Sequence, residues 1–303
     1  MEIKYLKHNQ IDKLKWDSAV ENSKNTLVYA LSWFLDIVSP KWDALVFGDY
    51  ELLMPLPWKS KLGIKYLYQP TFIQQLGLFS NIDINHESIK SFILEVEKHF
   101  KIADIQLNFA NPKLETGKFI LRNTQLIDIS KSYDDLLNKY VKNHKKNLKK
   151  INESGLRINS KGMSFDFIDL LGNMFVKKGV NEITKSDISK LKHVIDLSIE
   201  KGFGEFYFGY LDDKLCASAF FLKWGKRVIV YTALNDLGRT AGAMFGLIDK
   251  YLKENSGQDL QFDFAGSNIP GVKYRNLGFG ARNEIYYQVK INNLPIPLRW
   301  LKK

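Results

Sequence analysis

The stretch that decides the fold runs from Ala233 to Met244: Ala-Leu-Asn-Asp-Leu-Gly-Arg-Thr-Ala-Gly-Ala-Met. It leaves a strand-like run and enters a helix-like one, with Gly238 and Gly242 between them. Glycine and alanine let another group approach the backbone closely, and Thr240 is a candidate N-cap. The first turn of such a helix presents unpaired N–H groups and a partial positive charge, which suit a phosphate or pyrophosphate. The alternative is a strand–helix loop whose glycines serve geometry alone.

Three strands are predicted before this turn, at Gly204–Leu211, Leu215–Trp224 and Arg227–Ala233. Their connections, Asp212-Asp213 and Gly225-Lys226, have the residues of tight hairpin turns. The remaining pattern of the second part predicts helices at 133–153, 165–177, 185–201 and 241–254, a strand at 260–264, a short helical or looped stretch to Leu277 and a strand at 284–291. This order indicates an α+β domain with a mostly antiparallel sheet.

The first part of the chain has an α+β pattern of its own. Helices are expected at 11–23, 29–37 and 88–100, and strands at 42–47, 51–56, 65–68, 102–109, 119–122 and 125–129. A chain of 303 residues also fits two domains of ordinary size. We therefore expect one domain over 1–130 and a second over 131–303.

Charge is divided unevenly between these parts. Residues 1–130 hold 15 basic and 15 acidic side chains, whereas residues 131–303 hold 29 basic and 18 acidic ones. The second part should therefore prefer anionic partners. Cys216 is the single cysteine, and the longest apolar run, Leu27 to Val38, contains Ser32 and Asp36. These features predict a cytoplasmic protein with neither a membrane span nor an internal disulfide.

Three antiparallel strands followed by Arg-x-x-Gly-x-Gly/Ala and a helix resemble the GNAT acyltransferase fold. Arg239 and Gly242 match the first and fourth positions of that loop, while Met244 stands at the sixth, where a small residue is usual. The resemblance implies an acyl-coenzyme A donor such as acetyl-CoA, with its pyrophosphate on the loop and its pantetheine arm along 227–233. It implies donor contacts from Ala233, Leu234, Gly238, Arg239, Thr240, Ala241, Gly242, Ala243 and Asn268.

A further stretch, Asn268 to Phe279, resembles the Asn…Tyr-x-x-x-Gly-Phe segment of GNAT enzymes. The resemblance implies that Tyr274 protonates the departing thiolate, although the interval from Asn268 is one residue short and Tyr274 could instead be a packing aromatic. Asp263 alternates with Phe262 and Phe264, so its side chain points to the opposite face of the strand. Asp263 could act as a base or orient an amine, or it could form an ion pair, for example with Arg275.

The runs Phe262 to Gly271, Leu277 to Ala281 and Tyr140 to Leu156 resemble the Fem aminoacyltransferases, as does Gln69 to Phe79. Those proteins contain two GNAT-like domains in tandem, which implies a sister domain in the first part. The acceptor amine, carried by a small molecule or a peptide, would enter between the domains. Fem enzymes that use aminoacyl-tRNA can carry a long coiled-coil arm, and no insert of that length is present here.

A basic helix is predicted at the start of the second domain. Six lysines and no acid lie between Lys139 and Lys150. Five of them, at 142, 145, 146, 149 and 150, recur at three- and four-residue spacing and so share one helical face, while Tyr140, Val141, Leu148 and Ile151 can pack inward. This face could bind tRNA or an anionic small molecule through Lys142, Lys145, Lys146 and Lys149, or it could be a solvated surface.

Other chemistry-bearing residues are scattered. The five histidines show no metal-ligand spacing, so no metal site is predicted. Cys216 lies among small apolar residues, as a core cysteine does. The leading hypothesis is therefore an acyl-CoA-dependent N-acyltransferase. The alternatives are an aminoacyl-tRNA-dependent aminoacyltransferase and a binding module without catalysis, and the sequence does not indicate the oligomeric state.

Overall fold

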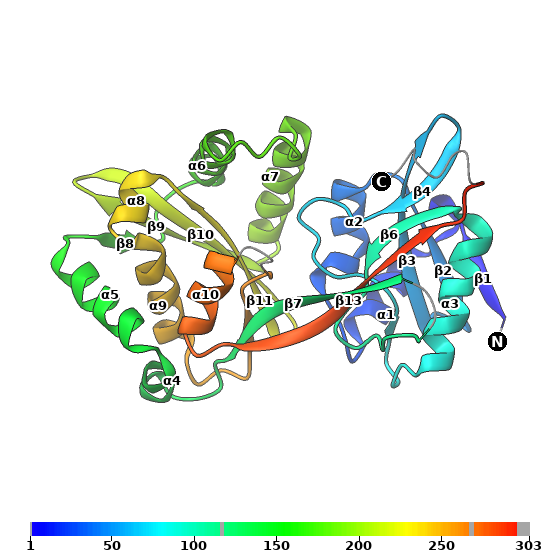
Figure 1. The fold of residues 1–303 in the computed structure, drawn as a ribbon, viewed down its shortest axis with the longest axis horizontal. Coiled ribbons are helices and arrows are strands. Elements are labelled where there is room, and N and C mark those ends of the chain that lie inside the picture. The colour runs from blue at the N-terminus through cyan, green and yellow to red at the C-terminus, as the bar shows by residue number, and fades with distance from the viewer. Residues whose placement is uncertain (1, 116–117, 267–269, 296–303) are drawn as a thin grey trace. The chain divides into compact units, whose positions relative to one another are not determined.

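The computed structural model describes residues 2–115, 118–266 and 270–295. The chain divides into unit 1, Met1–Arg122 with Ile285–Lys303, and unit 2, Asn123–Glu284 (Figure 1). The polypeptide passes from one unit to the other within β7 (Lys118–Asp128) and again within β13 (Arg282–Asn292). The strand after Glu284 therefore groups with the first unit, whereas sequence reasoning placed it in the second domain.

Unit 1 contains one mixed, mostly antiparallel sheet. Its strands lie in the order β1-β2-β3-β4-β6-β13, with β5 added beside β3. The β4–β6 pair is parallel, and the neighbouring pairs are antiparallel. The strands not yet bounded are β1 (Ile3–Leu6), β2 (Trp42–Phe47), β3 (Leu52–Lys61), β4 (Ile64–Tyr68), β5 (Phe79–Ser80) and β6 (Ile102–Gln106).

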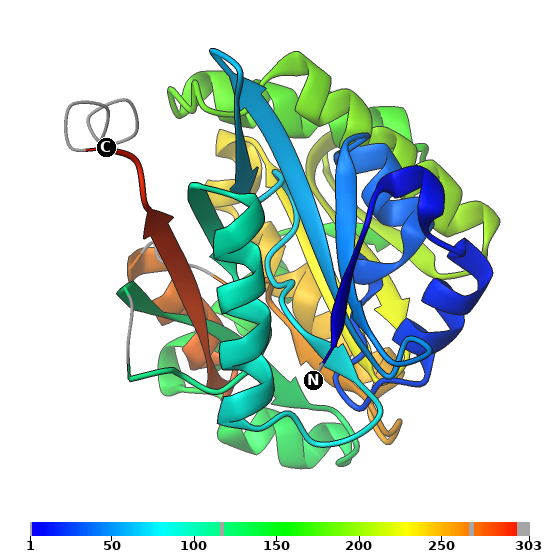
Figure 2. The same ribbon diagram turned by 90° about the vertical axis from the view of Figure 1, so that its right-hand side faces the viewer.

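Three helices of unit 1 follow the expected positions: α1 (Lys13–Glu21), α2 (Ser32–Val38) and α3 (His86–His99). Helix α3 starts where the Asn85 side chain accepts a hydrogen bond from the Ser88 N–H at 2.8 Å. Its apolar residues at helical spacing, among them Phe92 and Val96, are fully buried against the sheet. Figure 2 shows α3 lying across this face.

The strands of unit 2 lie in the order β7-β12-β11-β10-β9-β8. Its strands are β8 (Arg157–Asn159), β9 (Gly204–Leu211), β10 (Lys214–Trp224), β11 (Arg227–Leu234) and β12 (Gln261–Asp263). The three antiparallel strands β9, β10 and β11 confirm the sequence prediction. Two expected strands at 119–122 and 125–129 are instead the single strand β7.

The helices of unit 2 are α4 (Tyr133–Lys139), α5 (Lys142–Glu153), α6 (Ser164–Lys177), α7 (Lys185–Glu200), α8 (Asp236–Thr240), α9 (Ala243–Asn255) and α10 (Pro270–Gly278). Helix α9 packs on the sheet, where Tyr251 stacks on Phe221 with ring centroids 3.9 Å apart. The long helix expected at 133–153 breaks into α4 and α5 because Tyr140 and Val141 are extended. No helix in the described ranges is both long and apolar enough to cross a bilayer.

Candidate functional site

Strands β11 and β12 part from each other inside unit 2. Their parallel pairing joins Arg227–Ile229 to Gln261–Asp263, and β12 ends there. Strand β11 continues to Leu234, and its antiparallel register with β10 extends over this whole length. A strand that extends beyond the end of its neighbour has an unpaired backbone edge there. An extended ligand that carries amide groups can form hydrogen bonds with that edge. Ala233 is fully buried and Leu234 half-buried at the end of this edge.

The turn after β11 is a short helix, which corrects the expectation of an open glycine loop. Asn235 caps it, since its Oδ1 accepts from the Gly238 N–H at 3.0 Å while its Nδ2 donates to the Leu215 carbonyl at 3.1 Å. Thr240 is the last residue of α8 and caps no helix. The asparagine at the strand end takes the capping position that sequence reasoning gave to Thr240. Gly238 faces the strand behind it, where a Cβ would collide with the Cys216 carbonyl.

Helix α9 begins one turn later. Gly242 is its N-cap with φ +68°, a conformation that favours glycine, and the Phe245 N–H donates to the Gly242 carbonyl at 2.9 Å. Ala243 and Met244 are buried in the apolar core of unit 2. Met244, the residue that departs from the GNAT loop pattern, therefore packs inward as a core side chain.

A cavity of about 300 Å³ lies at the end of β11 between α6 and α8. Arg239 lines it with its side chain about half exposed, and its Nη1 lies 3.5 Å from Asp236 Oδ1. Lys177 also lines the cavity and pairs with Asp236. The other lining residues are Leu170, Asn173, Met174, Leu234, Asn235 and Leu237.

Two further cations belong to the surroundings of Arg239. Burial, together with the positive charges of Arg239 and Arg275, lowers the pKa of Lys178. Burial lowers the pKa of Arg275 to about 10. Its guanidinium bonds to its neighbour Asn276, with Nη2 to Oδ1 at 2.9 Å. Within the described ranges no carboxylate lies within 4 Å of Lys178 or Arg275, whereas Arg239 is paired with Asp236. Lys178 and Arg275 are therefore candidate contacts for an anion.

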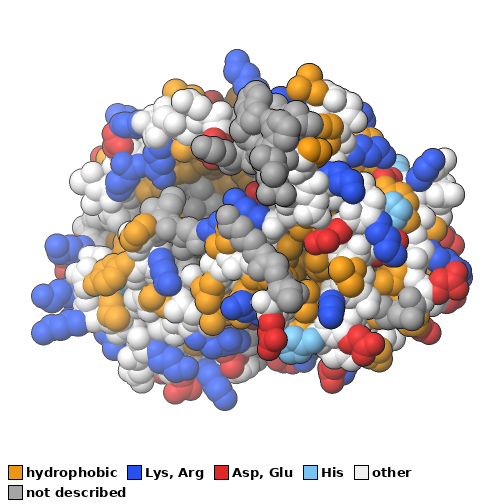
Figure 3. Space-filling model, turned by 45° about the vertical axis from the view of Figure 1, so that its right-hand side comes forward, with side chains coloured by type: hydrophobic (Ala, Val, Ile, Leu, Met, Phe, Trp, Pro, Cys, Tyr) orange, Lys and Arg blue, Asp and Glu red, His pale blue; other side chains and the backbone are white. Residues whose placement is uncertain are grey.

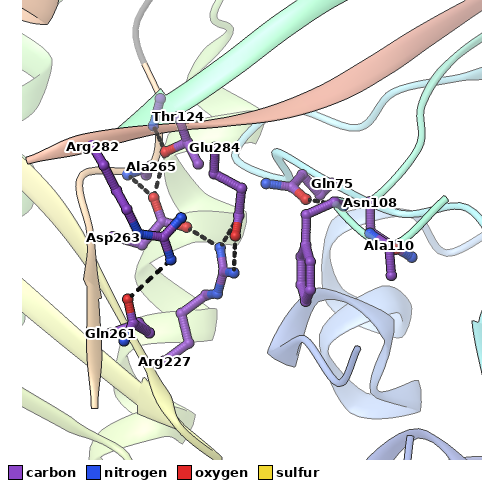
Figure 4. A network of polar contacts seen from close by, with 12 residues as sticks. Gln75, Asn108, Ala110, Thr124, Arg227, Gln261, Asp263, Ala265, Arg282 and Glu284 are labelled. Carbon is purple, nitrogen blue, oxygen red and sulfur yellow. Dashed lines mark hydrogen bonds and ion pairs between the residues drawn. The ribbon is translucent and has the colours of Figure 1, made fainter. Parts of the chain in front are cut away.

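Asp263 holds a buried ion network at the point where β11 and β12 part (Figure 4). Arg227 Nη1 donates to Asp263 Oδ2 at 2.7 Å and to Glu284 Oε2 at 2.9 Å. The other oxygen of Asp263 accepts from the Ala265 N–H at 2.9 Å and from the Thr124 hydroxyl. The ion pair expected for Asp263 therefore exists, but its partner is Arg227 rather than Arg275.

The network is largely buried. Asp263 is 2% exposed and Arg227 8% exposed. Burial alone would lower the pKa of Arg227, yet the charges of Asp263 and Glu284 raise it above its ordinary value. Two carboxylates around one guanidinium leave this group with one excess negative charge. Both oxygens of Asp263 have hydrogen-bond donors, an arrangement that fixes the carboxylate in place.

Tyr274 lies on α10 with its side chain 68% exposed. Arg275 follows it, and the Arg275 carbonyl accepts a hydrogen bond from His144 Nε2 at 2.8 Å, which ties α5 to α10. Asn268, the remaining expected contact, lies outside the described residues. Sequence reasoning did not single out Lys178, Arg227 or Glu284, because each is an ordinary charged residue whose partners come from distant segments.

The lysines of α5 lie on its outer face. Lys142, Lys146 and Lys149 are exposed, while Lys145 is half-buried with its Nζ 3.3 Å from the Asn138 carbonyl. Figure 3 shows Lys and Arg side chains that project from the surface, among them a group at the left edge of the view. His144 and Ile151 on the inner face are buried, as the helical spacing allows.

The described residues contain no group of three or more His, Cys, Asp or Glu side chains that could hold a metal ion. Cys216 is fully buried in the core of unit 2, and its thiol lies 3.3 Å from the Gly209 carbonyl. Burial raises the pKa of this thiol to about 11, which removes it from consideration as a nucleophile near neutral pH.

No protein-family model and no curated protein sequence matches this chain. Among solved structures, the chain is similar to FemX, with a TM-score of 0.63, 13% identity and full coverage of both chains. It is also similar to a GNAT-family acetyltransferase from Colwellia psychrerythraea, with a TM-score of 0.54, 12% identity and coverage of 96% and 100%. A tandem GNAT protein from the clavulanic acid biosynthesis pathway gives a TM-score of 0.50 at 10% identity, covering 97% and 99%. These likenesses show the fold: the chain is an α+β protein with the tandem GNAT-like fold, and its fold is related to that of FemX.

Proposed function

We propose that the chain is an acyltransferase whose second unit binds an acyl-coenzyme A donor and transfers its acyl group to an amine. The observation that carries the proposal is that a strand end, a helix start and several cations occur together. The end of β11 beyond β12, the start of α9 at Gly242 and Arg239 follow one another in the chain. Lys178, whose pKa the positive charges of Arg239 and Arg275 lower, adds a cation with no carboxylate within 4 Å in the described ranges. The fold relationship to acetyltransferase structures supports the same conclusion.

The donor would lie along this region from end to end. Its pantetheine amides would pair with β11 up to Ala233 and Leu234, and its pyrophosphate would rest at the helix start formed by Ala241, Gly242 and Ala243. Helix N-termini suit such an anion through their unpaired N–H groups. The N–H groups of Ala241 and Gly242 already donate to the Leu237 and Arg239 carbonyls, at 3.0 and 3.2 Å, so the anion would use the N–H of Ala243. Arg239, Lys178 and Arg275 would neutralise the phosphates, and Gly238 and Thr240 would shape the turn.

The chemistry needs only one bond to form and one to break. The amine nitrogen of a small-molecule or peptide acceptor attacks the acyl carbon, the carbon–sulfur bond breaks, and the amine loses a proton to a general base. The departing thiolate gains a proton, and we propose Tyr274 as the donor. Asp263 would act as a positioning residue, since it holds Arg227 at the parting of β11 and β12.

Calorimetry and thermal denaturation with acetyl-CoA test this donor. We expect saturable heat and a raised Tm. The Arg275→Met variant should bind about tenfold more weakly, because a charge-assisted bond to phosphate is lost. Arg282→Met is the matched control, since Arg282 is exposed and its guanidinium lies 3.4 Å from Gln261 Oε1. No heat and no Tm shift at millimolar acetyl-CoA would refute the acyl-CoA donor.

A second candidate donor is aminoacyl-tRNA, and the lysine face of α5 favours it. Within the described ranges no carboxylate lies within 4 Å of these lysines, and α5 is tied to α10 through His144. The affinity for tRNA, measured by a full binding titration, should fall steeply as the salt concentration rises. Binding should be lost in the triple variant Lys145→Glu/Lys146→Glu/Lys149→Glu. The control reverses three exposed lysines elsewhere in unit 2: Lys185, Lys201 and Lys214. Equal loss in both triple variants would indicate a nonspecific charge effect. If neither donor binds, the chain is a binding module.

A further inference from the structure

The hairpin of β3 and β4 in unit 1 has an unusual tip. Lys61 pairs with Ile64, so the turn consists of two residues, Leu62 and Gly63, with φ +51° and +76°. Two-residue hairpin turns with both φ values positive prefer Asn, Asp or Gly. Leucine is disfavoured in this conformation, and here its side chain is also 78% exposed. An apolar side chain therefore occupies a solvent-facing position that turn geometry would give to asparagine.

Positive charge surrounds this tip. Lys59, Lys61 and Lys65 lie on the hairpin and are exposed, and no acidic residue occurs between Glu51 and Asp83. Lys65 Nζ lies 3.9 Å from the buried Asp43 carboxylate. For Lys59 and Lys61, no carboxylate of the described chain lies within 4 Å, so their charges are available to an anionic surface. This local excess is hidden in the zero net charge of the first 130 residues.

The aromatic side chains at the base of the hairpin are covered by lysines. Lys65 lies over the Trp58 ring at 4.0 Å and Lys41 lies 5.4 Å from the same ring. Lys59 lies over the Tyr68 ring at 4.2 Å. Nucleic-acid platforms present open aromatic faces on which bases stack. Covered rings beside a bare leucine are instead the arrangement of an interfacial anchor, in which aliphatic stems and rings lie among lipid headgroups.

We propose that the β3–β4 hairpin docks on an anionic phospholipid surface, with Leu62 entering the headgroup region and the lysines contacting lipid phosphates. Figure 1 shows the hairpin projecting at the top of unit 1. Each lysine near an anionic surface strengthens binding about fivefold, and the leucine adds an apolar contribution that salt does not screen. This surface lies in unit 1, and its membrane role does not depend on which acyl donor unit 2 binds.

Co-sedimentation with vesicles tests the proposal. Full-length protein should bind vesicles of phosphatidylcholine with phosphatidylglycerol and bind poorly to phosphatidylcholine alone. Leu62→Asn suits the turn better than leucine and should fold normally, yet it should lower the vesicle affinity about tenfold. The matched control is Leu14→Asn, because Leu14 lies on α1 and is 87% exposed. Lys59→Glu/Lys61→Glu should abolish binding, whereas Lys90→Glu on α3 should not.

A fluorophore at the tip gives a second readout. Cys216 is fully buried, so the Leu62→Cys variant offers one accessible thiol for an environment-sensitive label. Its emission should shift to the blue on anionic vesicles, while a label at Leu14→Cys should not respond. The proposal is overturned if wild-type protein ignores anionic vesicles or if Leu62→Asn binds them as wild type does. It is also overturned if wild-type protein binds RNA but not vesicles and Lys59→Glu/Lys61→Glu abolishes that RNA binding.

Discussion

At Gly238 the packing of α8 on β10 leaves no room for a side chain, because a Cβ would meet the Cys216 carbonyl. We expect Gly238→Ala to destabilise the protein by about 1–3 kcal/mol through overpacking. Gly172 in α6 is the matched control, since no atom lies within 4 Å of the Cβ position there. Gly172→Ala should stabilise the protein by about 0.5–1 kcal/mol. Urea unfolding measures both, and equal effects would contradict the close contact.

The buried network around Arg227 predicts an order of severity at single residues. Arg227→Met leaves two carboxylates, Asp263 and Glu284, without their cation, and should cost about 3–5 kcal/mol. Asp263→Asn leaves Arg227 paired with Glu284 and should cost less. Free energies of unfolding from urea titration measure both losses of stability. If Asp263→Asn loses more stability than Arg227→Met, charge balance is not what stabilises the network.

One contact joins two helices, and it predicts how stability changes with pH. Burial lowers the pKa of His144, whose Nε2 donates to the Arg275 carbonyl and whose buried Nδ1 has no partner among the described residues. The unfolded chain then binds the proton more readily than the folded one. The stability that His144 contributes is therefore fully present above its pKa in the unfolded chain, about 6.5, and declines as the pH falls below that value.

Unfolding in urea at pH 7.5 and pH 5.5 measures this dependence. The His144→Gln variant keeps a donor toward Arg275 but cannot titrate, so its stability should change less between the two pH values. The exposed His86 provides the control variant, His86→Gln, which should keep the wild-type slope. A wild-type slope in His144→Gln would assign the pH dependence to other groups.

Elements with strong local signals could be predicted from the sequence. Strands β9, β10 and β11 were found because Asp212-Asp213 and Gly225-Lys226 mark their turns. Local sequence does not predict the break between α4 and α5, because the break depends on distant contacts: the Val141 N–H donates to the Gly278 carbonyl at 3.0 Å. The candidate site divides in the same way. The turn at Gly238–Gly242 was visible locally, but the pairing of Asp263 with Arg227 needs β11 and β12 side by side.

At the scale of the whole molecule, the chain returns to its first unit at its end. Strand β13 pairs with β6, and Ile291 lies opposite Ala103 in the core that α3 covers. Unit 2 has a separate apolar core around Leu247. Of the six tryptophans, unit 2 holds Trp224 alone, whereas Trp16, Trp33, Trp42 and Trp58 lie in the first 122 residues of unit 1, so tryptophan fluorescence reports mainly on unit 1.

This distribution predicts that a change near the end of the chain is reported by residues near its start. Ile291→Ala should lower the stability of unit 1 by about 2–3 kcal/mol, because it opens a cavity beside β6. The fluorescence transition should then move to lower urea, ahead of the loss of helical circular dichroism, much of which comes from the seven helices described in unit 2. Leu247→Ala should do the opposite: the dichroism transition should move to lower urea than the fluorescence transition. If both variants shift both signals together, the two units unfold as one cooperative body and β13 couples them tightly.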